Sequence, residues 1–195
     1  MQSVEFYRPL IEEIEYKGKK YKLTPSYDNV LSMFHDIKGL DPTGQAEVML
    51  YYLMEEPVLD AGILYAINDA LFPPNKKTSG GKVFDFIQDG ALIYAAFRQA
   101  YGIDLIEEQG KLHWWKFQAL FGGLPSNTKF IEVVSIRRRE LPKPTKHNSE
   151  QRAELMRLKQ LYALDITQEE REQNLQEGLK KVAMALIARA GGKNA

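Results

Sequence analysis

The chain has 195 residues, no cysteine, and 26 basic and 26 acidic side chains. With 44% hydrophobic residues it can bury one substantial core, so one domain with an appendage is expected. The lack of cysteine excludes disulfides, thiolate nucleophiles and thiolate-ligated metals. Balanced charge gives no overall attraction to nucleic acid or anionic membranes. Because neither a signal-peptide pattern nor a long apolar run occurs, we expect a cytoplasmic protein without a membrane span.

The first predicted element is a β-hairpin over residues 10–23. Apolar residues partly alternate on both sides of Lys17-Gly18-Lys19, a pattern typical of two strands joined by a tight turn. Acidic residues crowd the first strand and lysines crowd the second, so cross-strand ion pairs are expected to help set the register. An isolated hairpin is only marginally stable, so we expect it to pack on the elements that follow.

Three amphipathic helices are predicted next, with short connections that favour antiparallel neighbours. Thr24-Pro25 and Asp41-Pro42 each combine an N-cap residue with a proline at the first helical position. Pro57 and Phe72-Pro73 end the second and third helices. The residues that mark the helical spacing are Tyr27, Val30, Leu31, Phe34 and Ile37, which line one face of the first helix, Val48, Tyr51, Tyr52 and Glu55 in the second, and Ile63, Leu64, Ile67 and Leu71 in the third.

Residues 75–82 form a predicted polar loop. Its stretch Ser79-Gly80-Gly81-Lys82 places glycines beside a lysine, as phosphate-binding loops do. However, the spacing G-x-x-x-x-G-K-[ST] is missing and no apolar strand precedes the glycines. A flexible loop without a phosphate site is therefore the favoured interpretation.

Three further helices are predicted over residues 84–101, 112–121 and 130–139. The first has a wide apolar stripe that suggests a central, heavily buried helix, and Gly102 is its expected stop. Ser126 is the expected cap of the third, whose β-branched residues also leave a strand open, although its position among helices favours a helix. The stripe of the first of these helices consists of Ile87, Gly90, Tyr94, Phe97 and Tyr101.

The chain is expected to divide into three segments. Residues 1–142 carry the hairpin and a helical core domain, residues 143–149 a proline-containing linker, and residues 150–195 a C-terminal helical hairpin or appendage. Near the C-terminus a helix is predicted from Ser149 to Leu164, and a capping box at Thr167–Glu170 opens another. The predicted fold class is mainly α, a bundle of about six to eight helices with an N-terminal β-hairpin.

No catalytic, cofactor-binding or metal-binding residue is predicted. The histidines at positions 35, 113 and 147 lack the spacing of metal ligands, and adjacent glutamates on a helix do not face each other. His113 lies in an aromatic setting, where a residue that caps or packs beside Trp114 is favoured over a general base. We therefore expect a protein that is not an enzyme.

One basic cluster, Arg137, Arg138 and Arg139, could contact phosphates at a few points. A solvated helix end that complements its own dipole is the favoured alternative, because the chain as a whole is neutral. Nucleic acid is therefore not expected as the main partner.

Large aromatic side chains concentrate between residues 89 and 117, which include both tryptophans. Such side chains dominate the energetics of cores and interfaces. Adjacent tryptophans on a helix point about 100° apart, so one is expected in the core and the other at an edge or a partner. An exposed second tryptophan would be a hot spot of about 2 kcal/mol or more. The candidate partner-binding residues are Tyr101, Asp104, His113, Trp114, Trp115, Lys116 and Phe117.

Five motifs stand out between residues 85 and 137: Asp85–Asp89, Ile93–Phe97, Tyr101–Leu105, Leu112–Phe117, and Leu124-Pro125 leading to Ile136-Arg137. Together they resemble one family, gene product fifteen of siphophages that infect Gram-positive hosts. The resemblance covers roughly residues 8–165. It implies a non-enzymatic tail assembly chaperone without a cofactor, which binds the tape measure protein while tail tube protein subunits are recruited.

By the same resemblance, the protein is expected in the host cytoplasm and absent from the mature virion. The physical hypothesis is that amphipathic helical surfaces mask apolar faces of a coiled-coil client. The sequence also leaves a homo-oligomer open. The alternative functions are a ring-forming structural component of the tail or head-tail connector and, less favoured, a nucleic-acid-binding phage protein.

Overall fold

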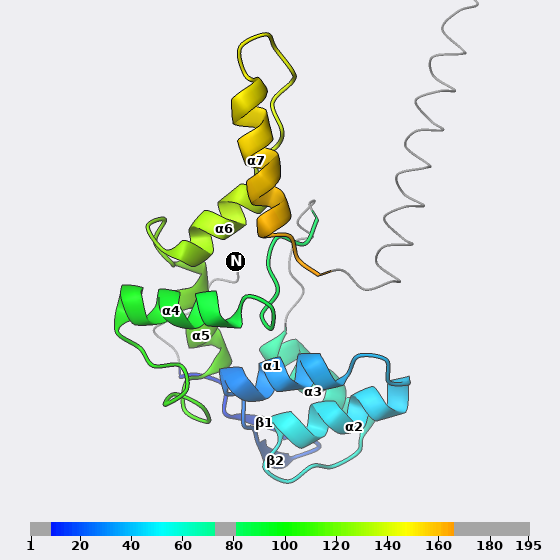
Figure 1. Ribbon diagram of the computed structural model, residues 1–195. Helices are drawn as coiled ribbons and strands as arrows, with labels where there is room; N and C mark the ends of the chain where they lie inside the picture. The colour runs from blue at the N-terminus through cyan, green and yellow to red at the C-terminus, as the bar shows by residue number, and fades with distance from the viewer. Residues whose placement is uncertain (1–8, 73–80, 166–195) are drawn as a thin grey trace, which may run out of the picture. The chain divides into compact units, whose positions relative to one another are not determined.

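A computed structural model describes residues 9–72 and 81–165 (Figure 1). Within these ranges there are two strands and seven helices, which confirms the mainly helical class with an N-terminal β-hairpin. The chain divides into two compact units, residues 1–140 and 141–195. The elements are β1 (Glu13–Tyr16), β2 (Lys19–Lys22), α1 (Tyr27–Asp36), α2 (Pro42–Leu53), α3 (Ala61–Leu71), α4 (Gly90–Tyr101), α5 (Trp114–Gly122), α6 (Lys129–Arg138) and α7 (Ser149–Leu161).

Two sequence predictions lie largely or wholly outside the described residues. They are the polar loop at residues 75–82, of which only the last two residues are described, and the helix opened by the capping box at Thr167–Glu170. Among the residues that the structure describes, no helix has both the length and the hydrophobicity needed to cross a membrane.

The predicted hairpin forms, with β1 and β2 antiparallel and Ile14 opposite Tyr21. Both residues of its tight turn, Lys17 and Gly18, have positive φ values of 51° and 74°. Such values suit the right-handed twist of a two-residue hairpin. An ion pair between Glu13 and Lys20 links the strands, as the charge pattern predicts. β1 packs on α3, so the hairpin rests on the helices as expected.

The first helix begins later than the Thr24-Pro25 signal predicts. The Thr24 N–H donates to the Leu53 carbonyl at 2.9 Å, and the Trp114 N–H donates to the Pro25 carbonyl at 2.7 Å. These bonds use the extended backbone between β2 and Tyr27, the first residue of α1. Pairing with residues distant in the chain thus outcompetes a local helix-start signal.

α2 starts as predicted but buries a different face. The Asp41 side chain accepts the Gly44 N–H at 3.1 Å, and Pro42 is the first helical residue. The buried residues are Leu50 and Leu53, whereas Tyr51, one of the residues that marked the helical spacing, is 71% exposed. Apolar residues fill every position from 48 to 54, so the hydrophobic period alone could not select the buried face. In α3 the predicted face is confirmed for Ile63, Ile67 and Leu71.

α4 begins at Gly90 and not at residue 84, because the residues before it form a separate turn. The Asp85 carboxylate accepts the N–H groups of Ile87 and Gln88 at 2.8 and 3.0 Å. A side chain that bonds nearby backbone in this way competes with helix formation. Ile87 is exposed as a result, contrary to its predicted inward position. Gly102, in the left-handed conformation, ends the helix as predicted.

α6 is a helix, so the alternative of a strand is excluded. Its N-cap is Thr128, not the predicted Ser126. The Thr128 hydroxyl donates to the Pro125 carbonyl at 2.9 Å, which stabilises the turn before the helix. α6 packs on α4 through a buried stripe made of Phe130, Val133 and Ile136.

The second unit contains α7, which matches most of the helix predicted from Ser149. Before it, the Asn148 side chain accepts the Thr145 N–H at 2.8 Å and donates to the Lys143 carbonyl at 2.9 Å. These bonds order the segment that the sequence predicts as a linker. Leu155 is the buried residue of α7.

Candidate functional site

The aromatic residues predicted to bind a partner form the centre of the core in the first unit. Phe117, 1% exposed, has Tyr27, Phe97 and Trp114 stacked around it with ring centroids at 4.9, 5.3 and 5.7 Å. Trp114 is 4% exposed and is therefore buried in the core, as expected for one tryptophan of the pair. Neither Phe117 nor Trp114 presents a surface that a partner could reach.

Trp115 and Lys116 remain nearer to solvent. Trp115 is half-buried, and its indole N–H donates to the Leu71 carbonyl at 3.3 Å, which ties α5 to the end of α3. Lys116 is exposed. A partner contact at these two residues remains a prediction.

His113 is the N-cap of α5, which confirms its predicted capping role. Its Nδ1 accepts the Trp115 N–H at 3.1 Å, and its Nε2 lies 3.1 Å from the Ile11 carbonyl oxygen. This arrangement requires the neutral tautomer with hydrogen on Nε2. Burial lowers the pKa of His113, in agreement with a neutral ring. The ring therefore fastens the N-terminal segment to α5.

Tyr101 and Asp104 use their polar groups within the fold. The Tyr101 hydroxyl donates to the Leu120 carbonyl at 2.8 Å. The Asp104 carboxylate accepts the Tyr94 hydroxyl at 2.9 Å, and this hydrogen bond is the main reason why the pKa of Asp104 lies below its ordinary value. Both residues hold the connection between α4 and α5 in place.

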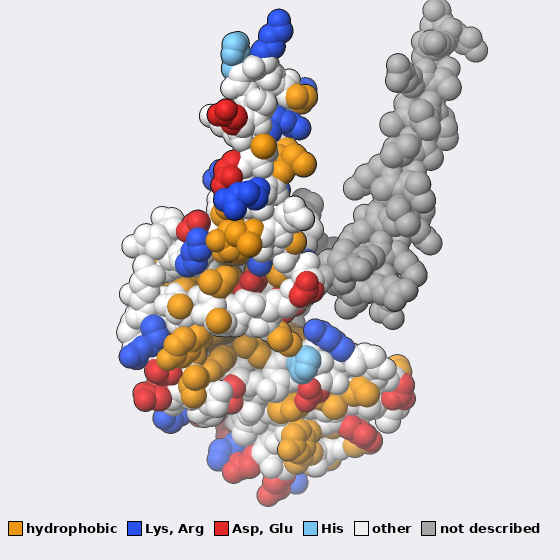
Figure 2. All heavy atoms as spheres, viewed as in Figure 1, with side chains coloured by type: hydrophobic (Ala, Val, Ile, Leu, Met, Phe, Trp, Pro, Cys, Tyr) orange, Lys and Arg blue, Asp and Glu red, His pale blue; other side chains and the backbone are white. Residues whose placement is uncertain are grey.

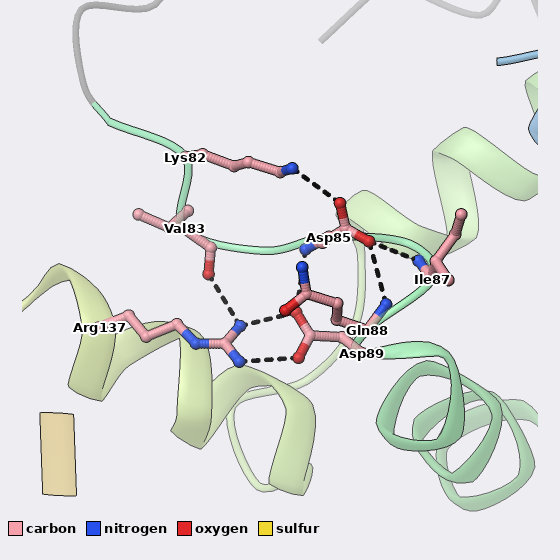
Figure 3. A network of polar contacts seen from close by, with 7 residues as sticks. All are labelled: Lys82, Val83, Asp85, Ile87, Gln88, Asp89 and Arg137. Atoms are coloured by element: carbon pink, nitrogen blue, oxygen red, sulfur yellow. Dashed lines mark hydrogen bonds and ion pairs between the residues drawn. The ribbon is translucent and has the colours of Figure 1, made fainter. Parts of the chain in front are cut away.

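Arg137 forms a buried ion pair with Asp89 instead of a free basic surface (Figure 3). Its two terminal nitrogens contact the two carboxylate oxygens at 2.6 and 2.8 Å, and one of them also donates to the Val83 carbonyl at 3.2 Å. The side chains of Arg137 and Asp89 are 11% and 3% exposed. Because this bidentate geometry uses the guanidinium edge, Arg137 is a clamp between α6 and the turn before α4.

Asp85 extends this network to Lys82 at 2.7 Å (Figure 3). Desolvation by itself raises the pKa of the Asp85 carboxyl, but the hydrogen bonds from Lys82, Gln88 and Ile87 outweigh it and lower the pKa to about 2. The turn is therefore held by a carboxylate that stays ionised at neutral pH.

Arg138 and Arg139 are exposed, so a phosphate contact remains a prediction for these two residues of the basic cluster. Within residues 9–72 and 81–165, no three His, Asp or Glu side chains lie close enough together to hold a metal ion.

An apolar hollow of the first unit is a groove between α1, α2 and α3, which we call the α1–α3 groove. It has a volume of about 620 Å³, within the range of roughly 300–1,000 Å³ usual for binding pockets. Its apolar lining includes Met33, Phe34, Met49, Leu64, Tyr65 and Phe72.

Each helix presents a continuous stripe to this groove. From α2, Pro42, Gln45, Ala46 and Met49 line it at spacings of three and four, which is one face of an α-helix. Tyr65 is 77% exposed and Phe34 is 41% exposed, so large aromatic side chains meet water at its edges. The sequence contains a signal for this surface, because each of these helices has more apolar positions than one buried face requires, but the sequence predictions did not include the groove.

The helices around the groove are strongly acidic. Residues 24–72 contain eight acidic side chains and one basic side chain, Lys38, a balance of −7. Two of the acids, Glu55 and Asp60, pair with the hairpin residues Lys22 and Lys17. Figure 2 shows acidic side chains beside hydrophobic ones over α1 and α2. The α1–α3 groove therefore combines an apolar lining with surrounding helices that carry a net negative charge.

A second, smaller hollow of about 430 Å³ lies between α1, α4 and the α4–α5 connection. The Tyr27 hydroxyl at its wall donates to the Leu105 carbonyl, and burial is the main cause that raises the pKa of Tyr27 to about 12. Its lining includes Tyr27 and Phe117 of the aromatic core described above, together with Phe86.

Comparison with known proteins identifies the chain through one family. No curated protein and no solved structure matches it. Residues 45–164, more than half of the chain, match the family described as Bacteriophage Gp15 protein. This range includes most of α2 and all of α3 to α7, but leaves the hairpin and α1 outside, although the resemblance seen in the sequence begins near residue 8. Membership of this family indicates a phage structural or morphogenesis protein. The chain belongs to the bacteriophage Gp15 protein family.

Proposed function

We propose that this protein is a tail assembly chaperone that binds the tape measure protein during phage tail assembly. It acts in the host cytoplasm, carries out no chemical reaction, and is left out of the finished virion. Family membership supports a role in morphogenesis. The observation that carries the finer proposal is the α1–α3 groove, which exposes large apolar side chains to solvent.

A solvent-exposed apolar groove is suited to an amphipathic helix. In helix-in-groove recognition, residues at i, i+3 or i+4, and i+7 of one helix enter a hydrophobic channel formed by others. A long helical client would otherwise expose such residues and aggregate before the tail tube surrounds it. Covering them in the groove would keep the client soluble until tail tube subunits replace the chaperone.

Co-expression with the tape measure protein of the same phage tests this function. We expect the client to be soluble only with the chaperone, and the two proteins to elute together in size-exclusion chromatography. Tyr65→Glu, in the groove, should reduce the complex at least about tenfold, as expected for an aromatic hot spot. Tyr51→Glu is the matched control, because Tyr51 is similarly exposed but does not line the groove.

Two results would contradict the proposal. One is a client that stays insoluble and yields no complex with the unaltered chain. The other is a stoichiometric amount of this protein in purified virions, measured by mass spectrometry. That second result would favour the alternative of a ring-forming structural component.

A further inference from the structure

We infer that the α1–α3 groove selects an amphipathic helix of a partner protein in which lysine or arginine residues flank the apolar stripe. The inference deepens the proposed function and rests on it for the identity of the natural partner. It concerns which helices the groove accepts, a property that follows from the length, the lining and the charge of the groove.

The length of the lining fits about three helical turns. On α3 it extends from Ala61 to Phe72, which at 1.5 Å per residue is roughly 16 Å. A partner helix crossing this distance places about three apolar residues, at i, i+3 or i+4, and i+7, against the groove.

Polar side chains are a minority of the lining, where only Gln45 and Asn68 are polar. The Gln45 side-chain amide already donates to the Leu40 carbonyl at 2.9 Å. The remaining lining is mainly aliphatic and aromatic, so it accepts any apolar side chain of suitable size. Discrimination between amphipathic helices must then come from the residues beside their apolar stripe.

Charge supplies that discrimination. After the two ion pairs with the hairpin lysines, six acidic residues and one lysine remain in residues 24–72. Asp69, four residues after Tyr65, lies next to the groove on the surface of α3 and is exposed. A helix with basic flanks meets a favourable potential here, whereas one with acidic flanks is repelled.

Two synthetic helical peptides of about four turns test the inference with the full-length protein. They share three leucines at i, i+4 and i+7, and carry either lysine or glutamate at the four flanking positions. In fluorescence anisotropy at low salt we expect the lysine peptide to bind at least about tenfold more tightly, with the preference shrinking as salt is added. Tyr65→Ala should weaken binding at least about tenfold, whereas Tyr51→Ala should leave it unchanged. Asp69→Lys should reduce the preference without abolishing binding.

Equal affinity for both peptides would overturn the inference, even if the tape measure complex forms. In that case the proposed function stands and charge selection fails. Lysine-peptide binding that ignores Tyr65→Ala would show that the acidic surface binds it elsewhere, which also overturns the inference. So would binding that appears only after residues 166–195 are removed or only when a dimer dissociates, because the chain or a second copy would then occupy the groove. If peptide selection holds but no tape measure complex forms, the groove chemistry is right and the proposed partner is wrong.

Discussion

The buried pair Asp89–Arg137 provides the sharpest test of the core structure. Arg137→Met removes two charge-assisted hydrogen bonds, at 2.6 and 2.8 Å, and leaves the Asp89 carboxylate buried without its counter-ion. Breaking one side of such a pair typically costs about 3–5 kcal/mol. Asp89→Leu should cost a similar amount, because it leaves the guanidinium without the carboxylate. Arg138→Met, one residue further along, should change the free energy of unfolding by less than about 0.5 kcal/mol.

The double variant Asp89→Leu/Arg137→Met completes the cycle. With both charges gone, its loss should be smaller than the sum of the single losses by about 2 kcal/mol or more. Urea unfolding followed by tryptophan fluorescence is the suitable assay, because both tryptophans lie in the first unit and report on it alone. Additive single losses, or equal losses for Arg137→Met and Arg138→Met, would refute the assignment of Arg137 as a structural clamp.

Three further changes probe other contacts of the first unit by the same unfolding assay. Gly62→Ala should destabilise the protein by about 1–3 kcal/mol because the new methyl group would overlap the phenol ring of Tyr16. In a Tyr16→Ala background the same change should be neutral or stabilising. A loss of equal size in both backgrounds would contradict this contact. His113→Ala should cost about 1 kcal/mol through loss of the cap, whereas His113→Asn should retain the cap. Because burial lowers the folded-state pKa of His113, the contribution of its neutral ring to stability is complete above pH 6.5 and is lost as the pH falls through the folded-state pKa. The wild type should therefore lose more stability than His113→Asn between pH 7.5 and 5.5. Identical pH profiles of the two proteins would exclude this linkage. Tyr27→Phe should cost about 1–3 kcal/mol because the buried Leu105 carbonyl loses its donor, and an unchanged free energy of unfolding would show that water replaces the hydroxyl.

Local sequence signals predicted an element correctly where the interaction that they require is made between residues close in the sequence. The Asp41-Pro42 start holds because the carboxylate and the N–H that it accepts are three residues apart. The Lys17-Gly18 turn and the Gly102 stop hold because both depend on φ values of one or two residues. The capping role of His113 belongs with these, since its acceptor atom and the Trp115 N–H are neighbours in the chain.

The starts of α4 and α1 were mispredicted because interactions other than hydrophobic burial fix the backbone before each helix. Before α4 the Asp85 carboxylate accepts nearby N–H groups and forms a separate turn. Arg137 also binds Asp89, which is 48 residues away in the sequence. Before α1, the Trp114 N–H donates to the carbonyl of Pro25, which is likewise distant in the sequence. Hydrophobic periodicity reports only which side of a segment is apolar, and it contains no information about distant partners. The predicted inward position of Ile87 was wrong because the Asp85 turn takes the place of the start of the helix there, although the helix itself was recognised.

The candidate site shows the same division. The aromatic stretch from residue 89 to 117 was recognised as important because large aromatic side chains must be covered by something. Whether the core or a partner covers them could not be read from their types, because both environments favour the same residues. In the folded chain Trp114 and Phe117 are buried in the core, whereas Phe34 of α1 and Tyr65 of α3 lie beside solvent.

Composition, caps, turns and family motifs thus specify a neutral, mainly helical phage protein with an N-terminal hairpin, since these signals act within a few residues or are sums over the whole chain. The tertiary structure assigns each apolar face to the core or to solvent, turns Arg137 into a clamp, and assembles the α1–α3 groove from three helices. Those outcomes depend on which faces pack together, and packing is a property of residues that are close in space but distant in sequence.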